Sequence, residues 1–532
     1  MMNRIKTALL IFFTLISMVF TGCTSEKQTE ESEFRVYPHL LAPSSTGVTI
    51  NWYTVNNDPG TLSLYYDGQD ENILTSYTSE PFYMEELEYS ELELSQETDF
   101  PDMFENRNYR HSILLKDLRP GTDYVYRVRQ GFELYQSSFR TAPKADTRQS
   151  IRFITFADSE TDPEGRETYR RWVPGAQAAE STGRPADAEQ YLVTEFEGYH
   201  ENLRTIESRQ PEFLLISGDI VQGGGYQRAW DEFFFQNAGK FGDILGGIPL
   251  IPAIGNWENY GARNGEYEPW AIAAARAKYA AYFDAPPNNN PNFRNFYYRI
   301  DYGPITILTL DSSNGLPDST DQDTNININA DTYPENNLPD INPGSDQWRW
   351  TIEQLKDASN KGQVIFVQFH HIPYSSGGHS LPLTAKGSSG QAGIPMRVYT
   401  PEFQKYGVVA VFCGHNESFE HSIIDGVHFY DVGVAGDGLG YALDKKDERF
   451  ENPYRLWVAH HDAEELWDGK QLMDGGKHYG HLEINVEPQE NGEFKISMTP
   501  VYIFPVTDTN GKVTGFERRI YDDEVELIVR NA

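Results

Sequence analysis

Five side chains of the kind that bind metal ions each come directly after a short apolar run. They are Asp158, Asp219, Asn256, His370 and His415. Carboxylate oxygens, an amide oxygen and imidazole nitrogens are the donors that divalent cations take from proteins. One such residue alone is weak evidence, because a single Asp often caps a turn and a single His is often an ordinary buried polar group. Five of them in this order predict a metal centre with Asp219 in its middle.

Each of these side chains lies at the carboxyl end of a predicted strand. The apolar runs are too short for helices and span residues 151–156, 213–216, 248–254, 364–369 and 408–413. Predicted helices lie between them, over residues 194–207, 226–237, 270–283 and 346–358. Alternating strands and helices are typical of an α/β fold whose strand ends bind ligands. We therefore expect all five side chains at one edge of one sheet, with late strands over residues 479–486 and 494–502 packing back on it.

The phrases around these residues resemble the calcineurin-like metallophosphoesterase superfamily. The matching phrases are Gly218-Asp219, Gly255-Asn256-x-Glu258, the stretch from His370 to Gly377, and Gly414-His415. The layout of the whole chain is similar to that of the purple acid phosphatases, which also carry an N-terminal β domain. The resemblance implies a four-layer α/β metallophosphoesterase sandwich that binds two divalent metal ions about 3.5 Å apart.

The resemblance also implies a role for each matching residue. Asp219 would bridge both metals, and Asn256, His370 and His415 would complete the second-metal site. Asp158 would bind the first metal. The implied catalytic residues are Asp219, Asn256 and His415, and the implied chemistry is attack of a metal-bound hydroxide on a phosphoester.

Four positions depart from the family pattern. Glu160 stands where the first motif commonly has His, and Gln222 where the purple enzymes have a metal-binding Tyr, so the purple colour is not expected. Trp257 replaces a His that steadies the phosphoryl group or protonates the leaving group. Glu417 replaces a His ligand of the first metal. His379, His421 or a group from residues 437–477 would have to supply the missing proton donor.

The first-metal site would therefore be rich in oxygen donors. Asp158, Asp219 and Glu417 are its implied ligands, and Glu160 and Gln222 are further candidates. Such a set favours Mg²⁺, Mn²⁺ or Ca²⁺ over Zn²⁺, although the sequence leaves the identity of the ions open among Mn, Mg, Ca, Fe and Zn. An alternative is that this site is empty and one metal remains. Trp257 and His371 are further candidates for positions at or beside the metals. Of the two neighbouring histidines, His370 is the expected ligand, because it ends its strand more directly.

The N-terminus is expected to direct export. Residues 1–6 are basic and residues 8–20 apolar, as in a signal peptide, and Phe20-Thr21-Gly22-Cys23 resembles a bacterial lipobox. The resemblance implies that residues 1–22 are a lipoprotein signal peptide and that Cys23 is lipidated; an ordinary signal peptide is the alternative. Residues 23–33 would form a tether to a bacterial membrane, the outer membrane in a Gram-negative host.

Residues 34–143 are predicted to form an all-β domain. Apolar and polar residues alternate over residues 48–52, 62–66 and 123–129, and Pro120-Gly121 provides a tight turn before the last of these. The pattern resembles a fibronectin type III sandwich. The acidic segment 83–105 is expected as a long loop. The metallophosphoesterase domain would span residues 150–532, with insertions near 311–344 and 437–477.

The charge of the chain restricts its partners. Its 532 residues carry 79 acidic and 44 basic side chains, for a net charge of −35. A polyphosphate would be repelled, so nucleic-acid binding is excluded. The first hypothesis is a metal-dependent phosphatase that hydrolyses a small phosphomonoester. A second is a catalytically impaired binding protein on the same scaffold, and a third is a surface adhesion or carbohydrate-handling protein.

Overall fold

The computed structural model describes most of the chain after residue 31. The described residues are 32–69, 72–95, 106–163, 169–171, 183–186, 188, 190–261, 269–329, 331, 338–436, 452–459, 466–475 and 478–530. The expected signal peptide, Cys23 and nearly all of the tether lie outside them. Among the described helices, none has the length and apolar character needed to cross a membrane.

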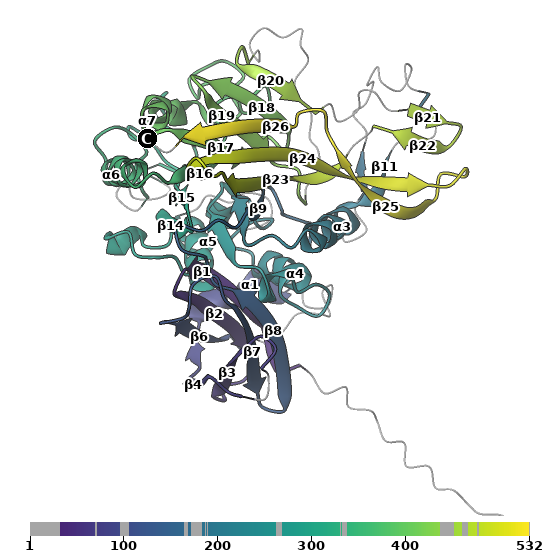
Figure 1. Cartoon of the computed structure of the whole chain (residues 1–532). Coiled ribbons are helices and arrows are strands. Elements are labelled where there is room, and N and C mark those ends of the chain that lie inside the picture. Colours follow the sequence, from purple (N-terminus) through teal and green to yellow (C-terminus); the bar gives the residue numbers. More distant parts are fainter. Residues whose placement is uncertain are drawn as a thin grey trace, which may run out of the picture. The chain divides into compact units, whose positions relative to one another are not determined.

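Two antiparallel β layers form the N-terminal domain (Figure 1). One layer has the strand order β1-β2-β6-β5 and the other β4-β3-β7-β8. The strands are β1 (Phe34–Ser44), β2 (Gly47–Thr54), β3 (Gly60–Tyr66), β4 (Thr75–Ser79), β5 (Phe82–Tyr83), β6 (Tyr109–Leu115), β7 (Asp123–Gln130) and β8 (Glu133–Arg140). The predicted alternation is confirmed, because Ile50, Trp52 and Tyr126 all point into the core between the layers.

The acidic segment that was expected as a long loop contains helical structure in its described part. It forms the 3₁₀ helix η1 (Glu85–Leu87) and the short helix α1 (Glu91–Ser95), while residues 96–105 lie outside the described chain. The Glu93 carboxylate is buried and accepts the backbone N–H groups of Ser90 at 2.8 Å and Arg228 at 3.0 Å. Composition shows the charge of such a segment but not which carboxylates find donors, so the docking of Glu93 could not be predicted.

The part of the chain after residue 150 is built on two stacked sheets. The first sheet has the order β25-β24-β23-β9-β12-β13 and continues into β1, with β26 beside β24. Its strands are β9 (Ile151–Phe156), β12 (Leu214–Ser217), β13 (Leu250–Ala253), β23 (Tyr479–Pro488), β24 (Glu493–Thr507), β25 (Val513–Ile520) and β26 (Val525–Arg530). β9, β12 and β13 are parallel, and β23 pairs antiparallel with β9, as expected for a late strand that packs back.

The second sheet has the order β14-β15-β16-β17-β19-β18-β20. Its strands are β14 (Tyr298–Tyr302), β15 (Ile305–Thr309), β16 (Val364–His371), β17 (Val408–Gly414), β18 (Phe419–Ile424), β19 (Val427–Val432) and β20 (Arg455–Val458). β15, β16, β17 and β19 run parallel to one another. Smaller pieces are β10 (Tyr169–Arg171), β11 (Gln190–Thr194), β21 (Leu466–Asp468), β22 (Gln471–Asp474), η2 (Ile244–Gly246), η3 (Trp257–Asn259), η4 (Pro291–Phe293) and η6 (Ile394–Tyr399).

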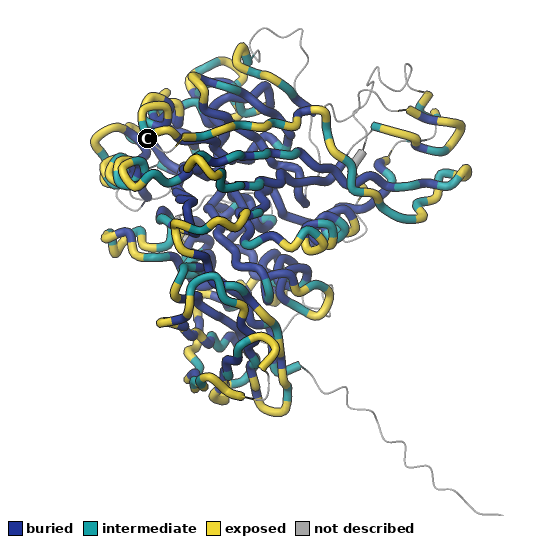
Figure 2. The backbone as a smooth tube through the Cα atoms, viewed as in Figure 1, coloured by how far each residue is buried: buried dark blue, intermediate teal, exposed yellow. Residues whose placement is uncertain are grey.

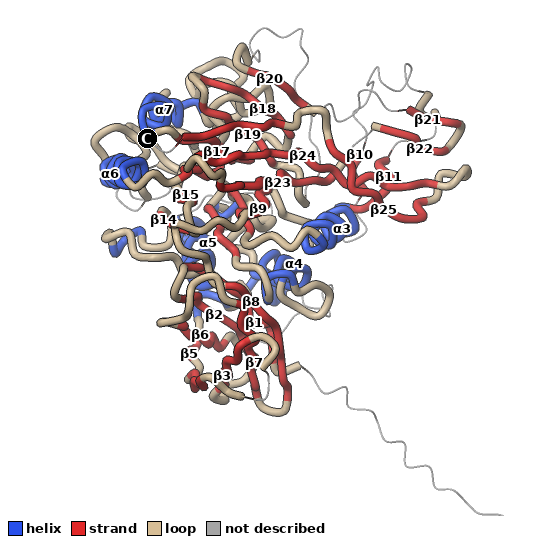
Figure 3. Tube along the Cα trace, in the orientation of Figure 1, coloured by secondary structure: helices blue, strands red, loops and turns tan. Residues whose placement is uncertain are grey.

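Helices cover the outer face of each sheet, which completes four layers (Figure 3). α3 (Glu195–Ser208), α4 (Gln227–Asn237) and α5 (Pro269–Tyr282) pack on the first sheet, and α6 (Asp346–Asn360) and α7 (Thr400–Tyr406) on the second. The expected helix starts follow from their caps, since Thr194 and Glu197 form a capping box on α3 and Ser345 caps α6. The predicted four-layer α/β sandwich is confirmed.

Neighbouring residues of β12 face opposite layers, which explains its continuous apolar run. Leu214 and Ile216 pack toward the helices, whereas Leu215 packs toward the second sheet. Strands buried on both faces have no polar side. Figure 2 shows the result as dark blue strands beneath a more exposed outer surface.

The expectation of one sheet edge is wrong in one respect. Asp158, Asp219 and Asn256 follow strands of the first sheet, whereas His370 and His415 belong to the second. An apolar run predicts a buried strand but carries no information about which of two stacked sheets contains it. The metal-binding side chains therefore meet across two sheets.

Candidate metal centre

Several site residues have a backbone conformation that is unusual for their type. Asp158 has φ 52°, Asp219 has φ 48°, His415 has φ 81° and Glu417 has φ 47°. Residues other than glycine rarely adopt this left-handed backbone conformation, and those that do are concentrated at functional sites. The turns after three different strands are therefore shaped for side-chain placement at some cost in backbone energy.

Two glycines allow the elements of the site to approach one another. A Cβ atom on Gly218 (φ 92°) would lie 2.7 Å from Nδ1 of His370. A Cβ atom on Gly414 would overlap with Oδ2 of Asp158. Glycine before Asp219 and before His415 is thus required by the distance between the two sheets at this point.

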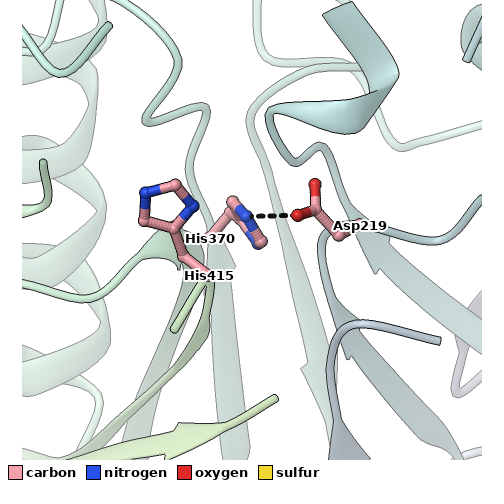
Figure 4. A group of neighbouring side chains, drawn as sticks. All are labelled: Asp219, His370 and His415. Carbon is pink, nitrogen blue, oxygen red and sulfur yellow. Dashed lines mark ion pairs between the residues drawn. The ribbon is translucent and has the colours of Figure 1, made fainter. Parts of the chain in front are cut away.

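One half of the site brings Asp219, Asn256, His370 and His415 together. Nε2 of His370 lies 2.9 Å from Oδ2 of Asp219 and 2.7 Å from Oδ1 of Asn256. Nδ1 of His415 lies 2.7 Å from the same Asn256 oxygen. Figure 4 shows the His370 imidazole between His415 and Asp219. Asp219, His370 and His415 form a buried group whose ligand atoms are close enough to hold one cation.

The hydrogen bonds of His370 suit such a cation. Nδ1 of His370 lies 3.1 Å from the carbonyl oxygen of Ser217, which can only accept a hydrogen bond. Nδ1 of the neutral ring therefore carries the proton, and the lone pair of Nε2 faces two oxygen acceptors. Three lone pairs that point at one another repel unless a cation lies among them, so the donors fit a metal ion.

The other half of the site is made of carboxylates. Asp158, Glu160 and Asp219 form a second buried group close enough to hold a cation. Asp219 is thus common to both groups. Asp158 accepts the backbone N–H of His415 at 3.0 Å, which ties the first sheet to the second, and Oε2 of Glu160 has no hydrogen-bond partner among the described residues.

Burial and mutual repulsion shift the pKa values of these groups. Burial first, and then the charges of Asp219, Asp431 and Glu417, hold the pKa of Asp158 well above its ordinary value. Burial and the neighbouring carboxylates do the same to the pKa of Glu160. On the imidazole side, burial lowers the pKa of His415 well below its usual value, which keeps the ring neutral. A bound cation would favour ionised carboxylates and neutral imidazoles alike.

The remaining candidates have different placements. Glu417 is half-buried, and its charge contributes to the raised pKa values of Asp158 and Glu160. Gln222 is half-buried on the loop after Asp219. The backbone N–H of Trp257 donates to Oδ1 of Asp219 at 2.8 Å, while its indole makes an edge contact with Tyr260. Trp257 therefore supports Asp219 through its backbone and offers no replacement for the family imidazole.

His371 is turned toward Ser312, with the serine Oγ 2.9 Å from its Nδ1 and its ring centroid 4.5 Å from that of His415. The imidazole therefore lies beside the site, next to a ligand-type residue.

Two buried acids near the site had no role assigned to them from the sequence. Glu258 accepts four backbone N–H groups, from Gly255, Asp219, Ile220 and Val221, at 2.7 to 3.2 Å. Asp431, at the end of β19, accepts Oγ–H of Ser418 at 2.7 Å and raises the pKa of Asp158. Glu258 stands in one of the matching phrases, two residues after Asn256, which was a usable signal, whereas Asp431 belongs to none of them.

The structure separates the three suggested proton donors. The His379 ring centroid lies 4.0 Å from that of His415. His421 instead places Nδ1 2.8 Å from Asp523 and Nε2 2.8 Å from His428, so both its nitrogens are occupied. Much of the segment 437–477 lies outside the described residues. Tyr226, four residues after Gln222, immediately precedes α4 and packs in the core rather than beside the metal-binding residues.

Two family profiles match this chain. The profile described as Calcineurin-like phosphoesterase matches residues 191–416, and Purple acid Phosphatase, N-terminal domain, matches residues 35–144. The chain carries a calcineurin-like phosphoesterase domain behind a purple acid phosphatase N-terminal domain. The phosphoesterase match includes Asp219, Asn256, His370 and His415 but begins after Asp158 and Glu160 and ends one residue before Glu417. Of the four positions that depart from the family pattern, Glu160 and Glu417 lie outside the match, whereas Gln222 and Trp257 lie inside it.

Two curated relatives of this chain have no assigned function in their names. Two uncharacterized proteins of Mycobacterium tuberculosis, from strains CDC 1551 and H37Rv, are each 27% identical over 324 residues. The alignments cover 59% of this chain and 50% of each relative. The chain thus spans about half the length of the curated relatives it matches.

Two solved structures support the fold of this chain. Purple acid phosphatase from yellow lupin (Lupinus luteus) seeds has a TM-score of 0.55 at 14% identity and covers 91% of this chain and 74% of its own. A structure of PhoD has a TM-score of 0.57 at 12% identity and covers 94% and 90%. At these identities the similarity establishes the architecture alone.

Proposed function

We propose that this chain is a metal-dependent phosphoesterase that hydrolyses small phosphomonoesters. The observation that carries the proposal is the position of Asp219, which belongs to both buried groups of metal-binding side chains. A carboxylate has two oxygens and can hold two cations side by side, as hydrolysis with two metal ions requires. The preference for monoesters rests on the purple acid phosphatase N-terminal domain, which is an argument from fold.

Asp158 and Asp219, with Glu160 or Glu417, would hold one cation, and Asp219, Asn256, His370 and His415 the other. Bound divalent cations would lower the pKa of a water molecule and neutralise charge on the phosphoryl oxygens. The protein residues fix these ligands before substrate arrives, through Ser217 behind His370 and Glu258 behind Asp219. With Glu417 in place of an imidazole, the first site would prefer Mn²⁺, Mg²⁺ or Ca²⁺ to Zn²⁺.

His379 is the residue best placed to give a proton to the leaving group. Ser389 uses its own hydroxyl proton on the carbonyl of Gln391, so its Oγ accepts from Nδ1–H of His379 at 2.7 Å. Nε2 of His379 is then the nitrogen that can take up and release a proton. Burial lowers the pKa of His379, which eases proton release.

We also propose that the protein is exported and anchored by a lipid on Cys23. The support is the basic and apolar sequence of residues 1–22 and the small residues before Cys23. Its membrane partner would be met through this lipid alone.

The test is metal analysis together with turnover of p-nitrophenyl phosphate and bis-p-nitrophenyl phosphate under Mn²⁺, Mg²⁺, Ca²⁺ and Zn²⁺. We expect metal-dependent turnover of the monoester and its loss in Asp219→Asn. Asp301→Asn is the matched control, because Asp301 is a β14 aspartate that pairs with Arg299 outside the site. A wild-type protein that binds metal but hydrolyses neither ester would favour the alternative of a binding protein.

A further inference from the structure

The residues after β15 enter the site from the side of the second sheet. Asp311, Ser312 and Ser313, here called the 311–313 triplet, have no exposed surface. They begin the insertion near residues 311–344. Their side chains make hydrogen bonds to three elements that lie around the metal-binding half formed by Asn256, His370 and His415.

Asp311 is held firmly by its neighbours. Gln347 of α6 donates from Nε2 to the Asp311 carbonyl and accepts the Asp311 N–H at Oε1, both at 2.9 Å. Oδ1 of Asp311 accepts the N–H of Ser313 at 3.0 Å. These contacts fix the backbone and one carboxylate oxygen, which leaves Oδ2 as the atom that faces α5.

Arg276 of α5 joins Asp311 to the loop that carries Asn256. Its Nη2 donates to Oδ2 of Asp311 at 2.6 Å, and its Nη1 donates to Oδ1 of Asn259 at 2.9 Å. The guanidinium is buried, and its carbon lies 4.0 Å from the centre of the Phe296 ring. A planar guanidinium can hold two partners at fixed angles, which an ammonium group cannot do.

Asn259 passes this constraint to Asn256. Since Arg276 occupies its oxygen, the amide nitrogen of Asn259 is directed the other way, donating to the carbonyl of Gly255 at 2.8 Å and to Oγ of Ser313 at 3.1 Å. Gly255 immediately precedes Asn256. Oδ1 of Asn256 lies 2.7 Å from Nε2 of His370 and 2.7 Å from Nδ1 of His415.

Ser312 fixes the ring of His371 in the same region. The backbone N–H of His371 donates to Oγ of Ser312 at 3.1 Å, so the serine proton is left to donate to Nδ1 at 2.9 Å. His371 then carries its proton on Nε2, which excludes Nδ1 as a metal ligand, and its ring packs beside that of His415.

We propose that Arg276 and the 311–313 triplet are positioning residues that set the cation affinity of the half formed by Asn256, His370 and His415. The inference deepens the proposed function and rests on it. Residues that orient ligands through hydrogen bonds commonly change metal affinity about 10- to 100-fold when they are replaced. None of these positioning residues needs to touch substrate.

The test variant is Arg276→Lys, which keeps the positive charge for Asp311 but gives up the second contact, to Asn259. The matched control is Arg299→Lys, because Arg299 of β14 is also mostly buried and also holds two partners, in its case the carboxylates of Asp301 and Asp357. The probe is Co²⁺, whose visible absorption reports the coordination geometry of its site, titrated into cation-free protein. Unfolding in urea is measured for both variants in the absence of cation.

We expect Arg276→Lys to weaken Co²⁺ binding about tenfold or more, and Arg299→Lys to leave it within about twofold. Equal Co²⁺ affinity in Arg276→Lys and wild type, with both folded, would overturn the inference alone. Equal weakening in the two variants would also overturn it, because the effect would then be general destabilisation. A wild-type protein that binds no Co²⁺ and no other divalent cation would overturn the inference and the proposed function together.

Discussion

Replacing Glu258 with Gln should separate the support of the metal loop from the metal ligands themselves. Oε2 of Glu258 accepts the N–H groups of Gly255 and Asp219, and Oε1 accepts those of Ile220 and Val221. In Glu258→Gln one oxygen is replaced by an NH₂ group. This group is a hydrogen-bond donor and cannot accept from the two backbone N–H groups that point at it. Two buried N–H groups then lose their acceptor, whichever way the amide is turned.

The expected cost follows from that count. A buried polar group left without a partner costs about 1–3 kcal/mol, so two such groups should lower the free energy of unfolding by about 2–6 kcal/mol. The effect should also reach Asp219, because its own backbone N–H is one of the four donors. We therefore expect weaker cation binding in addition to lower stability.

The assay is urea unfolding of the Glu258→Gln variant with and without Mn²⁺. Glu420→Gln is the matched control, because Glu420 is also buried and accepts four hydrogen bonds, but two of its donors are the hydroxyls of Ser375 and Ser376. Hydroxyls can turn and accept from an amide, so the control should lose less. A loss below about 1 kcal/mol in Glu258→Gln would refute the reasoning.

Three further outcomes can be checked. His379→Ala should lower kcat about 10²-fold or more for an alkyl phosphate and far less for p-nitrophenyl phosphate, whose leaving group needs no proton; equal losses for both substrates would exclude His379 as the donor. Glu417→His should raise Zn²⁺ affinity about tenfold relative to Mn²⁺, measured by competition with a chelator, and an unchanged ratio would show that Glu417 is not a ligand. In cation-free protein, burial first and Asp219 next raise the pKa of Glu258 to about 7 from 4.5, so the folded state binds more protons than the unfolded state and loses stability as pH rises through that range. The stabilisation added by Mn²⁺, seen as a shift in urea midpoint, should therefore grow between pH 5 and pH 8, and a shift that stays constant or shrinks would contradict this sign.

The strands that carry the metal-type residues could be predicted because their apolar runs are short and uninterrupted. The run at residues 213–216 and the polar residues behind it place Asp219 correctly at a strand end. Strands with mixed composition were missed, among them β14, which alternates buried with more exposed residues, and β25, which has no fully buried residue. Whether Asp219 and His370 share a sheet could not be predicted, because stacking is decided by packing between distant segments.

The support of the site is harder to predict than its ligands. Asp311 follows the apolar run at residues 305–310 just as Asp219 follows its own, so the same rule applied there would have pointed to it. Its partner Arg276 lies in a helix and carries no motif. A buried ion pair of this kind depends on tertiary approach, which no local pattern reports, and the four N–H partners of Glu258 were hidden for the same reason.

The pairing of β1 with β13 couples the N-terminal domain to the loop that carries Asn256. Leu41 lies opposite Leu250 in this parallel pair, and β13 leads directly to Asn256. The hydroxyl of Tyr126 donates to the carbonyl of Gly246 at 2.8 Å, and Arg35 pairs with Asp231 at 2.9 Å. Deleting residues 34–143 would leave β13 as an exposed edge strand with unpaired backbone groups, which promotes aggregation. The two domains should therefore unfold in a single calorimetric transition. Replacing the N-terminal domain with an unrelated domain would also remove the strand that pairs with β13, the strand that precedes Asn256.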